Sequence, residues 1–184
     1  MDESGLLMAP LLRRSWALRG QPPEQEQKAG HREKVSVAAA LWLPPARDRL
    51  HLAYQALPNG YFTNVEVAAF LRCAVEGLPD PVIALWDCGT MHKGPPIREL
   101  VEQAPGRLAI EPVPPYSPEL IPVEFLWTWL KYDRLCNFAP RDATDLNQAI
   151  ARELETAADN QELLRSFFHL SALQLPRTCF PRME

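Results

Sequence analysis

Hydrophobic and polar positions alternate along two segments in the first third of the chain. Over residues 35–43 every second side chain is apolar, which is the period of a strand with one buried face. Residues 50–56 alternate in the same way, and residues 44–48 between the two runs contain two prolines and an aspartate. Two alternating runs that are joined by a short turn predict an antiparallel hairpin.

The pattern then changes to helices and strands in alternation. Thr63 and Glu66 form a capping box, which predicts a helix over 64–77. Residues 82–86 are apolar throughout, as in a strand covered on both faces. A further strand is expected near 107–113. Other helices are expected at about 97–103, 122–132 and 160–170, and after Asp142 with Leu146, Ile150 and Leu154 on one face.

This order of elements predicts a mixed α/β domain, in which an antiparallel hairpin precedes parallel strands flanked by helices. Sheets of this kind place their chemistry beyond the carboxyl ends of the parallel strands. Asp87 directly follows the apolar strand 82–86 and is therefore the first candidate functional residue.

Composition narrows the class of protein. The 184 residues are 47% hydrophobic and 23% charged, which is typical of one soluble globular domain. Nineteen basic against 23 acidic residues give a net charge of −4, which argues against a free-standing DNA-binding module, although residues 13–34 are locally basic. No apolar run approaches the roughly 20 residues of a membrane span. The four cysteines are scattered, so we expect a reduced, cytosolic protein without a membrane partner.

Three segments place an acid in a characteristic setting: DESGLLMAP from residue 2, LWDCGTMHKG at 85–94 and PPYSPELIPVEFLWTWLK at 114–131. In that order they resemble the motifs DESGFxLxP, LDNASIHK and PPYSPELNPIE of DDE transposases in the mariner and bacterial insertion-sequence superfamily. The resemblance runs from Asp2 to about Leu173. It predicts a catalytic domain over 1–173 and a C-terminal tail at 174–184.

The resemblance implies a ribonuclease H-like fold and an acidic triad of Asp2, Asp87 and Glu124. It also implies metal-dependent cleavage and strand transfer of DNA at transposon ends, on a nucleoid-associated protein. Mg²⁺ or Mn²⁺ would bind in a two-metal site, because hard cations prefer carboxylate oxygens and two cations can clamp the attacking and leaving oxygens of a phosphodiester. Each acid also has a simpler interpretation as a helix-start, turn or terminal residue.

Basic residues near the motifs are candidates for DNA contacts. Arg13, Arg14 and Arg19 resemble the basic stretch that follows the family's first acid, and a solvated loop is the alternative. His92 and Lys93 follow the second acid, and for them a polar loop or helix start is equally compatible with the sequence.

Some positions depart from the family. Cys88 and Ile121 stand where the family usually has asparagine, so fewer amides are available to orient the carboxylates. Relatives carry helix-turn-helix segments before the first acid, and that acid lies on a central strand, so the resemblance implies an N-terminally truncated member whose first strand is shortened. The alternative function is an inactive remnant that associates with another protein, either a second copy of itself or an intact transposase.

Overall fold

The computed structural model describes residues 1–9, 11–21, 24 and 33–173, and the tail expected at 174–184 lies outside these residues. Its larger sheet has three antiparallel strands in the order β1 (Asp2–Leu7), β2 (Lys34–Trp42) and β3 (His51–Pro58). The hairpin predicted from alternation is confirmed as β2 and β3, which pair from Val35–Pro58 to Trp42–His51. All six residues of β1 pair with β2, with Asp2 opposite Ala39.

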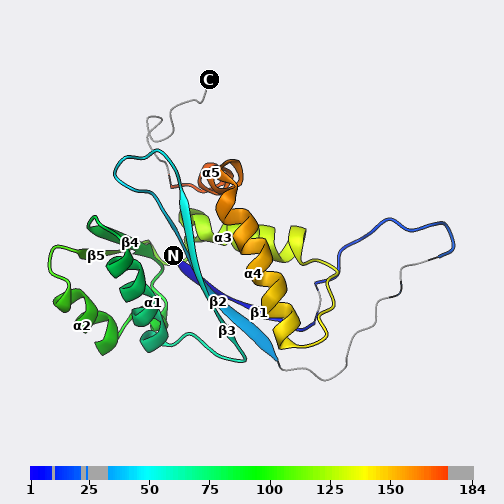
Figure 1. Ribbon diagram of the computed structural model, residues 1–184, viewed down its shortest axis with the longest axis horizontal. Coiled ribbons are helices and arrows are strands. Elements are labelled where there is room, and N and C mark those ends of the chain that lie inside the picture. Colours follow the sequence, from blue (N-terminus) through cyan, green and yellow to red (C-terminus); the bar gives the residue numbers. More distant parts are fainter. Residues whose placement is uncertain (10, 22–23, 25–32, 174–184) are drawn as a thin grey trace.

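The smaller sheet consists of two parallel strands, β4 (Val82–Trp86) and β5 (Leu108–Pro112). Two helices, α1 (Asn64–Gly77) and α2 (Pro95–Gln103), lie beside it on the same side of the molecule (Figure 1). The predicted capping box is present, because Thr63 accepts a hydrogen bond from the start of α1 and Glu66 accepts one from the Thr63 amide. The helix–strand alternation that the sequence predicts is therefore confirmed.

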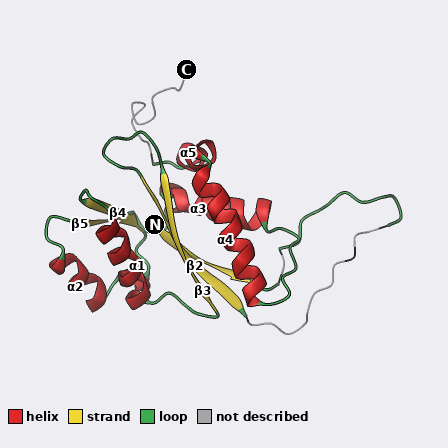
Figure 2. Cartoon of the chain, in the orientation of Figure 1, coloured by secondary structure: helices red, strands yellow, loops and turns green. Residues whose placement is uncertain are grey.

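The two sheets meet at a single backbone hydrogen bond. The Met1 nitrogen donates to the Leu85 oxygen of β4 at 2.7 Å, and β1 makes no ladder with β4 among the described residues. Beyond this point β1 runs beside the loop that follows β4, since the Glu3 side chain contacts His92. The mixed sheet expected from the sequence is thus present as two adjoining sheets (Figure 2).

Three further helices cover the face of the larger sheet that points away from α1 and α2. They are α3 (Pro122–Thr128), α4 (Ala143–Asp159) and α5 (Gln161–Leu170). Asp142 caps α4 as predicted, accepting a hydrogen bond from the Asp145 amide at 2.8 Å. The helix expected over 122–132 is α-helical only as far as Thr128 and continues as a π-helical segment, Trp129–Arg134. Irregular helical turns of this kind are frequent at functional sites.

Two hydrophobic cores result, one on each side of the larger sheet. The first core packs α3, α4 and α5 against β1–β3 around Leu126, Ile150 and Leu164. The second packs α1, α2, β4 and β5 around Val67 and Trp86. The candidate acids lie where the two cores adjoin.

The expectation that strand 82–86 is covered on both faces is wrong. Ala84 and Trp86 are buried against α1 and α2, but Ile83 on the opposite face is 68% exposed. This face of β4 lines an open cavity of about 510 Å³ beside the end of the β2–β3 hairpin. The helices of the second core therefore cover one face of β4 only.

No helix among the described residues combines the length and the apolar character needed to cross a bilayer.

Candidate active site

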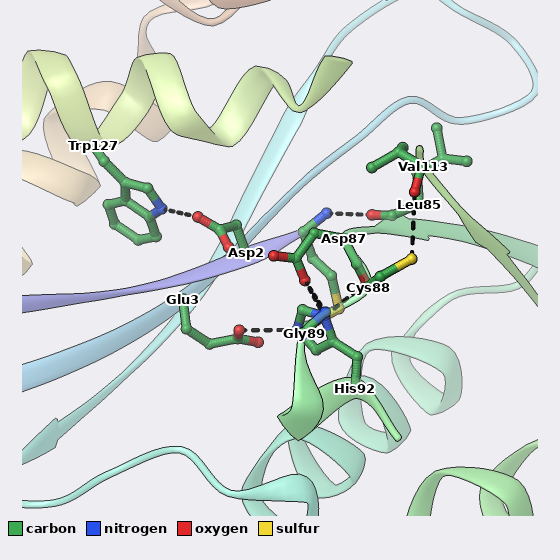
Figure 3. Close-up of polar contacts among 10 residues, drawn as sticks. Asp2, Glu3, Leu85, Asp87, Cys88, Gly89, His92, Val113 and Trp127 are labelled. Carbon is green, nitrogen blue, oxygen red and sulfur yellow. Dashed lines mark hydrogen bonds and ion pairs between the residues drawn. The ribbon is translucent and has the colours of Figure 1, made fainter. Parts of the chain in front are cut away.

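The three acids come from separate elements that converge between the two cores. Asp2 begins β1, Asp87 follows the last residue of β4, and Glu124 lies in the first turn of α3. Figure 3 shows the Asp2 side chain extending from β1 toward α3, with Asp87 on the adjacent loop. In addition to burial, the charge of Glu124 raises the pKa of Asp2, and the charge of Asp87 raises the pKa of Glu124.

Asp2 is partly buried beneath α3, and Trp127 is the side-chain donor to its carboxylate among the described residues. The Trp127 Nε1–H donates to Asp2 Oδ2 at 2.8 Å (Figure 3). Burial, followed by the negative charge of Glu124, raises the pKa of Asp2 to about 6, although the hydrogen bond from Trp127 opposes this shift. The first candidate acid is therefore held in an environment that disfavours its charged form.

Glu124 shares this environment with Lys131. Burial raises the pKa of Glu124; the positive charge of Lys131 opposes that shift, while the charge of Asp87 adds to it. Burial also lowers the pKa of Lys131, whose Nζ donates to Ser4 Oγ at 2.7 Å. The Glu124 carboxylate itself makes no side-chain hydrogen bond to any described residue, so its oxygens remain available as ligands.

Asp87 is held differently, by Gly89 and His92. Its Oδ1 accepts a hydrogen bond from the Gly89 amide at 2.8 Å and lies 2.6 Å from His92 Nδ1 as an ion pair, while the Asp87 backbone oxygen lies 3.1 Å from the same ring nitrogen. Its side chain is 49% exposed, and Oδ2 makes no hydrogen bond within the described part of the chain. A Cβ at position 89 would lie 2.8 Å from Asp87 Oδ1, so the close approach of this amide requires glycine.

His92 is buried and links Asp87 to β1. Its Nε2 lies 2.9 Å from Glu3 Oε2, and its ring stacks on Trp86 at a centroid distance of 4.6 Å. Burial is the largest influence and lowers the pKa of His92, but the hydrogen bond and charge of Glu3, together with Asp87, raise it above its usual value. Because the ring is buried and both nitrogens face oxygens of this chain, its position favours the structural alternative over a contact with DNA.

The other candidate DNA contacts are all exposed but differ in their contacts with the chain. Arg13 is engaged by the chain itself, through the Tyr132 oxygen at 2.8 Å and the Asp133 carboxylate at 2.9 Å. Arg14, Arg19 and Lys93 are exposed. These three cations are therefore accessible to an anionic partner.

The two departures from the family motifs have clear positions. The Cys88 thiol lies 3.6 Å from the Val113 oxygen and links the ends of the two parallel strands. Ile121 is 4% exposed and belongs to the first hydrophobic core. Neither side chain donates to a candidate acid, and the orienting contacts come from Gly89, His92 and Trp127 instead.

Sequence reasoning missed Glu3 and Lys131 as members of the site. Glu3 immediately follows the first acid, and Lys131 is the last residue of the third motif, so both were within segments already singled out. Trp127, which lies in the same helix as Glu124, is 3% exposed and donates to Asp2.

The donor set fits a divalent cation, although the described residues do not form a complete metal cage. No group of three or more acidic, histidine or cysteine side chains in this part of the chain has metal-holding geometry. However, the Asp87 Oδ2 and the Glu124 carboxylate make no side-chain hydrogen bond to any residue that the structure describes, and Asp2 lies beside Glu124. Unpaired carboxylate oxygens of this kind are the ligands that Mg²⁺ and Mn²⁺ prefer.

An antiparallel hairpin, an adjoining parallel pair and three acids between two groups of helices define a ribonuclease H-like domain of the type found in transposases. The sequence profile described as DDE superfamily endonuclease matches residues 1–147, and the chain belongs to this family. No curated protein matches the chain by sequence.

Solved structures agree on the fold. A Mos1 transposase paired-end complex with the left transposon end is 19% identical, with a TM-score of 0.63, over 91% of this chain and 50% of that one. A Mos1 mariner paired-end complex with Mn is 18% identical, with a TM-score of 0.64, over 91% and 50% of the two chains. The catalytic domain of Mos1 mariner transposase is 16% identical, with a TM-score of 0.50, over 74% and 68%. The chain thus spans about half the length of the first two.

Proposed function

We propose that this protein is the catalytic part of a DNA transposase, which cleaves phosphodiester bonds and transfers DNA strands at transposon ends. The observation that carries the proposal is the convergence of Asp2, Asp87 and Glu124 from three separate elements in a chain of the DDE endonuclease family. A Mos1 transposase structure of the same fold is a paired-end complex with the left transposon end, which supports DNA as the partner.

Asp2, Asp87 and Glu124 would hold Mg²⁺ or Mn²⁺, in the two-metal form expected of the family. When bound, the cations would stabilise negative charge on the attacking and leaving oxygens of the phosphodiester. Mos1 complexes with Mn and with Mg support this choice of ions. The negative charge that burial and mutual repulsion make unfavourable at Asp2 and Glu124 is the charge that a cation would neutralise.

The chain's own residues contribute orientation and charge. Trp127 holds one oxygen of Asp2, and Gly89 and His92 hold one oxygen of Asp87. Lys131 places a positive charge beside Glu124 and Asp2. The exposed Arg14, Arg19 and Lys93 are suited to contacts with DNA phosphates, which provide affinity without reading sequence.

The direct test is nicking of a supercoiled plasmid by the full chain in Mg²⁺ or Mn²⁺, followed on agarose gels. We expect metal-dependent conversion to open circles, and a loss of about 10³-fold or more in Asp87→Asn and in Glu124→Gln. Glu99→Gln is the matched control, because Glu99 is an exposed acid on α2, outside the site. It should nick as the parent does.

Nicking that persists in both site variants would assign the activity elsewhere and contradict the proposal. Absence of nicking in the parent chain, although the chain binds DNA, would favour the second candidate function.

That second candidate is a protein-association module, acting with another copy or with an intact transposase. It is favoured by apolar side chains in the segment that follows β1, where Leu12, Trp16 and Leu18 are 73%, 100% and 75% exposed. Exposed apolar groups of this size commonly mark interaction surfaces. Light scattering after gel filtration should then show an oligomer that Trp16→Ala dissociates, whereas a monomer in both samples would remove this support.

A further inference from the structure

His92 occupies a position in which its ring has little freedom. It ends the short turn Thr90–His92 after β4, and its side chain is 2% exposed. The ring lies nearly parallel to that of Trp86, with an interplanar angle of 5°. A stacked and buried ring of this kind presents its two nitrogens in fixed directions.

The two nitrogens face residues on opposite sides of the ring. Nδ1 lies 2.6 Å from Asp87 Oδ1 as an ion pair and 3.1 Å from the Asp87 backbone oxygen, and Nε2 is 2.9 Å from Glu3 Oε2 (Figure 3). Glu3 lies on β1 next to Asp2, so the chain Glu3–His92–Asp87 joins the strand of the first acid to the loop of the second. This connection spans the point at which the N-terminal nitrogen of Met1 donates to the Leu85 oxygen and, among the described residues, the two sheets form no ladder.

Burying the Glu3 carboxylate at this position costs folding free energy, which suggests a role beyond packing. Its side chain is 9% exposed, and its Oε1 is buried without a hydrogen-bond partner among the described residues. A buried ion pair with an unsatisfied oxygen generally stabilises a fold no better than apolar residues of similar volume. The benefit of the arrangement is therefore expected in the geometry of Asp87.

We propose that His92 and Glu3 are positioning residues, which hold Asp87 Oδ1 on the protein side so that Oδ2 faces the cation. The role in metal binding rests on the proposed function. The contacts of Glu3 and His92 with Asp87 can nevertheless be tested in the metal-free chain. Outer contacts of this type commonly change metal affinity by about 10- to 100-fold when they are removed.

Two isosteric substitutions separate positioning from packing. His92→Asn places an amide nitrogen near the position of Nδ1 and keeps a donor to Asp87, whereas His92→Gln places its amide nitrogen near Nε2 and keeps only the contact with Glu3. Both variants lose the stacked ring, so a purely structural role would lower their unfolding temperatures and their metal affinities in parallel.

The first readout is the dissociation constant of Mn²⁺ for the full chain, from electron paramagnetic resonance titrations. We expect His92→Gln to weaken Mn²⁺ binding by about 10- to 100-fold, and His92→Asn to retain most of the parental affinity. Glu3→Gln, which keeps an acceptor for the imidazole, should be milder than Glu3→Leu. Equal losses in His92→Asn and His92→Gln, matching equal losses in unfolding temperature, would overturn the proposal.

The second readout needs no metal. The Gly89 amide donates to the same Asp87 oxygen, so its hydrogen exchange, followed by NMR, reports whether Asp87 remains in place. Exchange should accelerate in His92→Gln and stay near the parental rate in His92→Asn. If the parent chain binds no Mn²⁺ but this difference is seen, the proposed function fails while the positioning role stands; equal exchange in both variants refutes the positioning role.

Discussion

The two sides of the candidate site hold their carboxylates by opposite means. On the β4 side, Asp87 is half exposed, and its Oδ1 accepts a hydrogen bond from the Gly89 amide and forms an ion pair with His92, which also contacts the Asp87 backbone oxygen. On the α3 side, Asp2 is partly buried next to Glu124, and its carboxylate accepts hydrogen bonds from the Trp127 side chain and from the Glu3 backbone. Hydrogen bonds favour a charged carboxylate, whereas burial beside another acid disfavours it. The first side is therefore arranged before any cation binds, and the second retains excess negative charge that a cation or a proton would relieve.

The largest effect that this comparison predicts is at Asp2. A rise in its pKa from 3.8 to about 6 corresponds to a cost of about 3 kcal/mol for holding the charge in the folded chain at neutral pH. Asp2→Asn removes the charge and keeps an acceptor for Trp127. It should therefore raise the free energy of unfolding of the metal-free protein by up to about 3 kcal/mol at pH 7 in urea titrations, while abolishing nicking.

Asp87→Asn is the matched variant on the other side. Because Asp87 is half exposed and its Oδ1 contacts the Gly89 amide and His92, its replacement should bring no comparable gain in stability. A gain at Asp87 equal to that at Asp2 would remove the distinction between the two sides.

The same shift predicts a pH dependence with a defined sign. The folded chain binds the Asp2 proton more tightly than the unfolded chain does, so this group's contribution to stability is fully present below about pH 3.8 and is lost as the pH rises through about 6. The stability difference between Asp2→Asn and the parent should therefore grow from pH 4 to pH 7. Thermal unfolding across this range checks it, and a constant difference would contradict it.

Protons should also compete with metal ions for Asp2, so metal binding should weaken below the Asp2 pKa of about 6. Below about pH 6, each further unit should reduce Mn²⁺ affinity by about tenfold, because Asp2 must lose its proton to act as a ligand. Titrations at pH 5 and pH 7 measure the difference. Equal affinities would show that Asp2 is not a ligand or that its pKa is not raised.

Gly89→Ala tests the preformed side. An alanine Cβ would approach Asp87 Oδ1 to 2.8 Å, so the carboxylate must move. Since the backbone angles of Gly89, φ −53° and ψ 153°, are allowed for alanine, the fold should be little affected. We expect a 10- to 100-fold slower nicking rate with a nearly unchanged unfolding temperature. A parental rate would show that Asp87 need not be held in this position.

Trp127→Phe is expected to have the smallest effect. It keeps most of the buried ring volume but removes the donor to Asp2, which should cost about 1–2 kcal/mol of stability at neutral pH. The hydrogen bond lowers the pKa of Asp2, so its loss should raise that pKa further and move the pH dependence of Mn²⁺ binding upward. Titrations of Mn²⁺ binding between pH 5 and pH 8 check this direction.

Much of the fold follows from local patterns in the sequence. Alternation fixed the β2–β3 hairpin, the Thr63–Glu66 capping box located the start of α1, and the run VIALW matched β4 residue for residue. The exposure of Ile83 was not predictable in this way, because an apolar run does not show which face of a strand lacks a covering helix. The change to a π-helical turn at Trp129 also leaves no signal in hydrophobic spacing.

In the candidate site, too, local sequence predicted some features, while others depend on contacts between segments that are distant in the sequence. Asp87 was placed by its position after a strand, whereas its orienting contacts depend on the packing of distant segments. Glu3 and His92 are 89 positions apart, and only the approach of β1 to the loop after β4 makes them neighbours. The role of Trp127 as a donor likewise depends on a contact across 125 positions.

The central claim is that Asp2, Asp87 and Glu124 together hold divalent cations, and a crystal structure of the full chain with Mn²⁺ tests it most directly. Data collected at the manganese absorption edge should show anomalous peaks between β1, the loop after β4 and α3, within coordination distance of all three carboxylates. Crystals of Glu124→Gln should have weakened or absent peaks. Parent crystals in saturating Mn²⁺ with no peak at these carboxylates, or with peaks only elsewhere, would contradict the account.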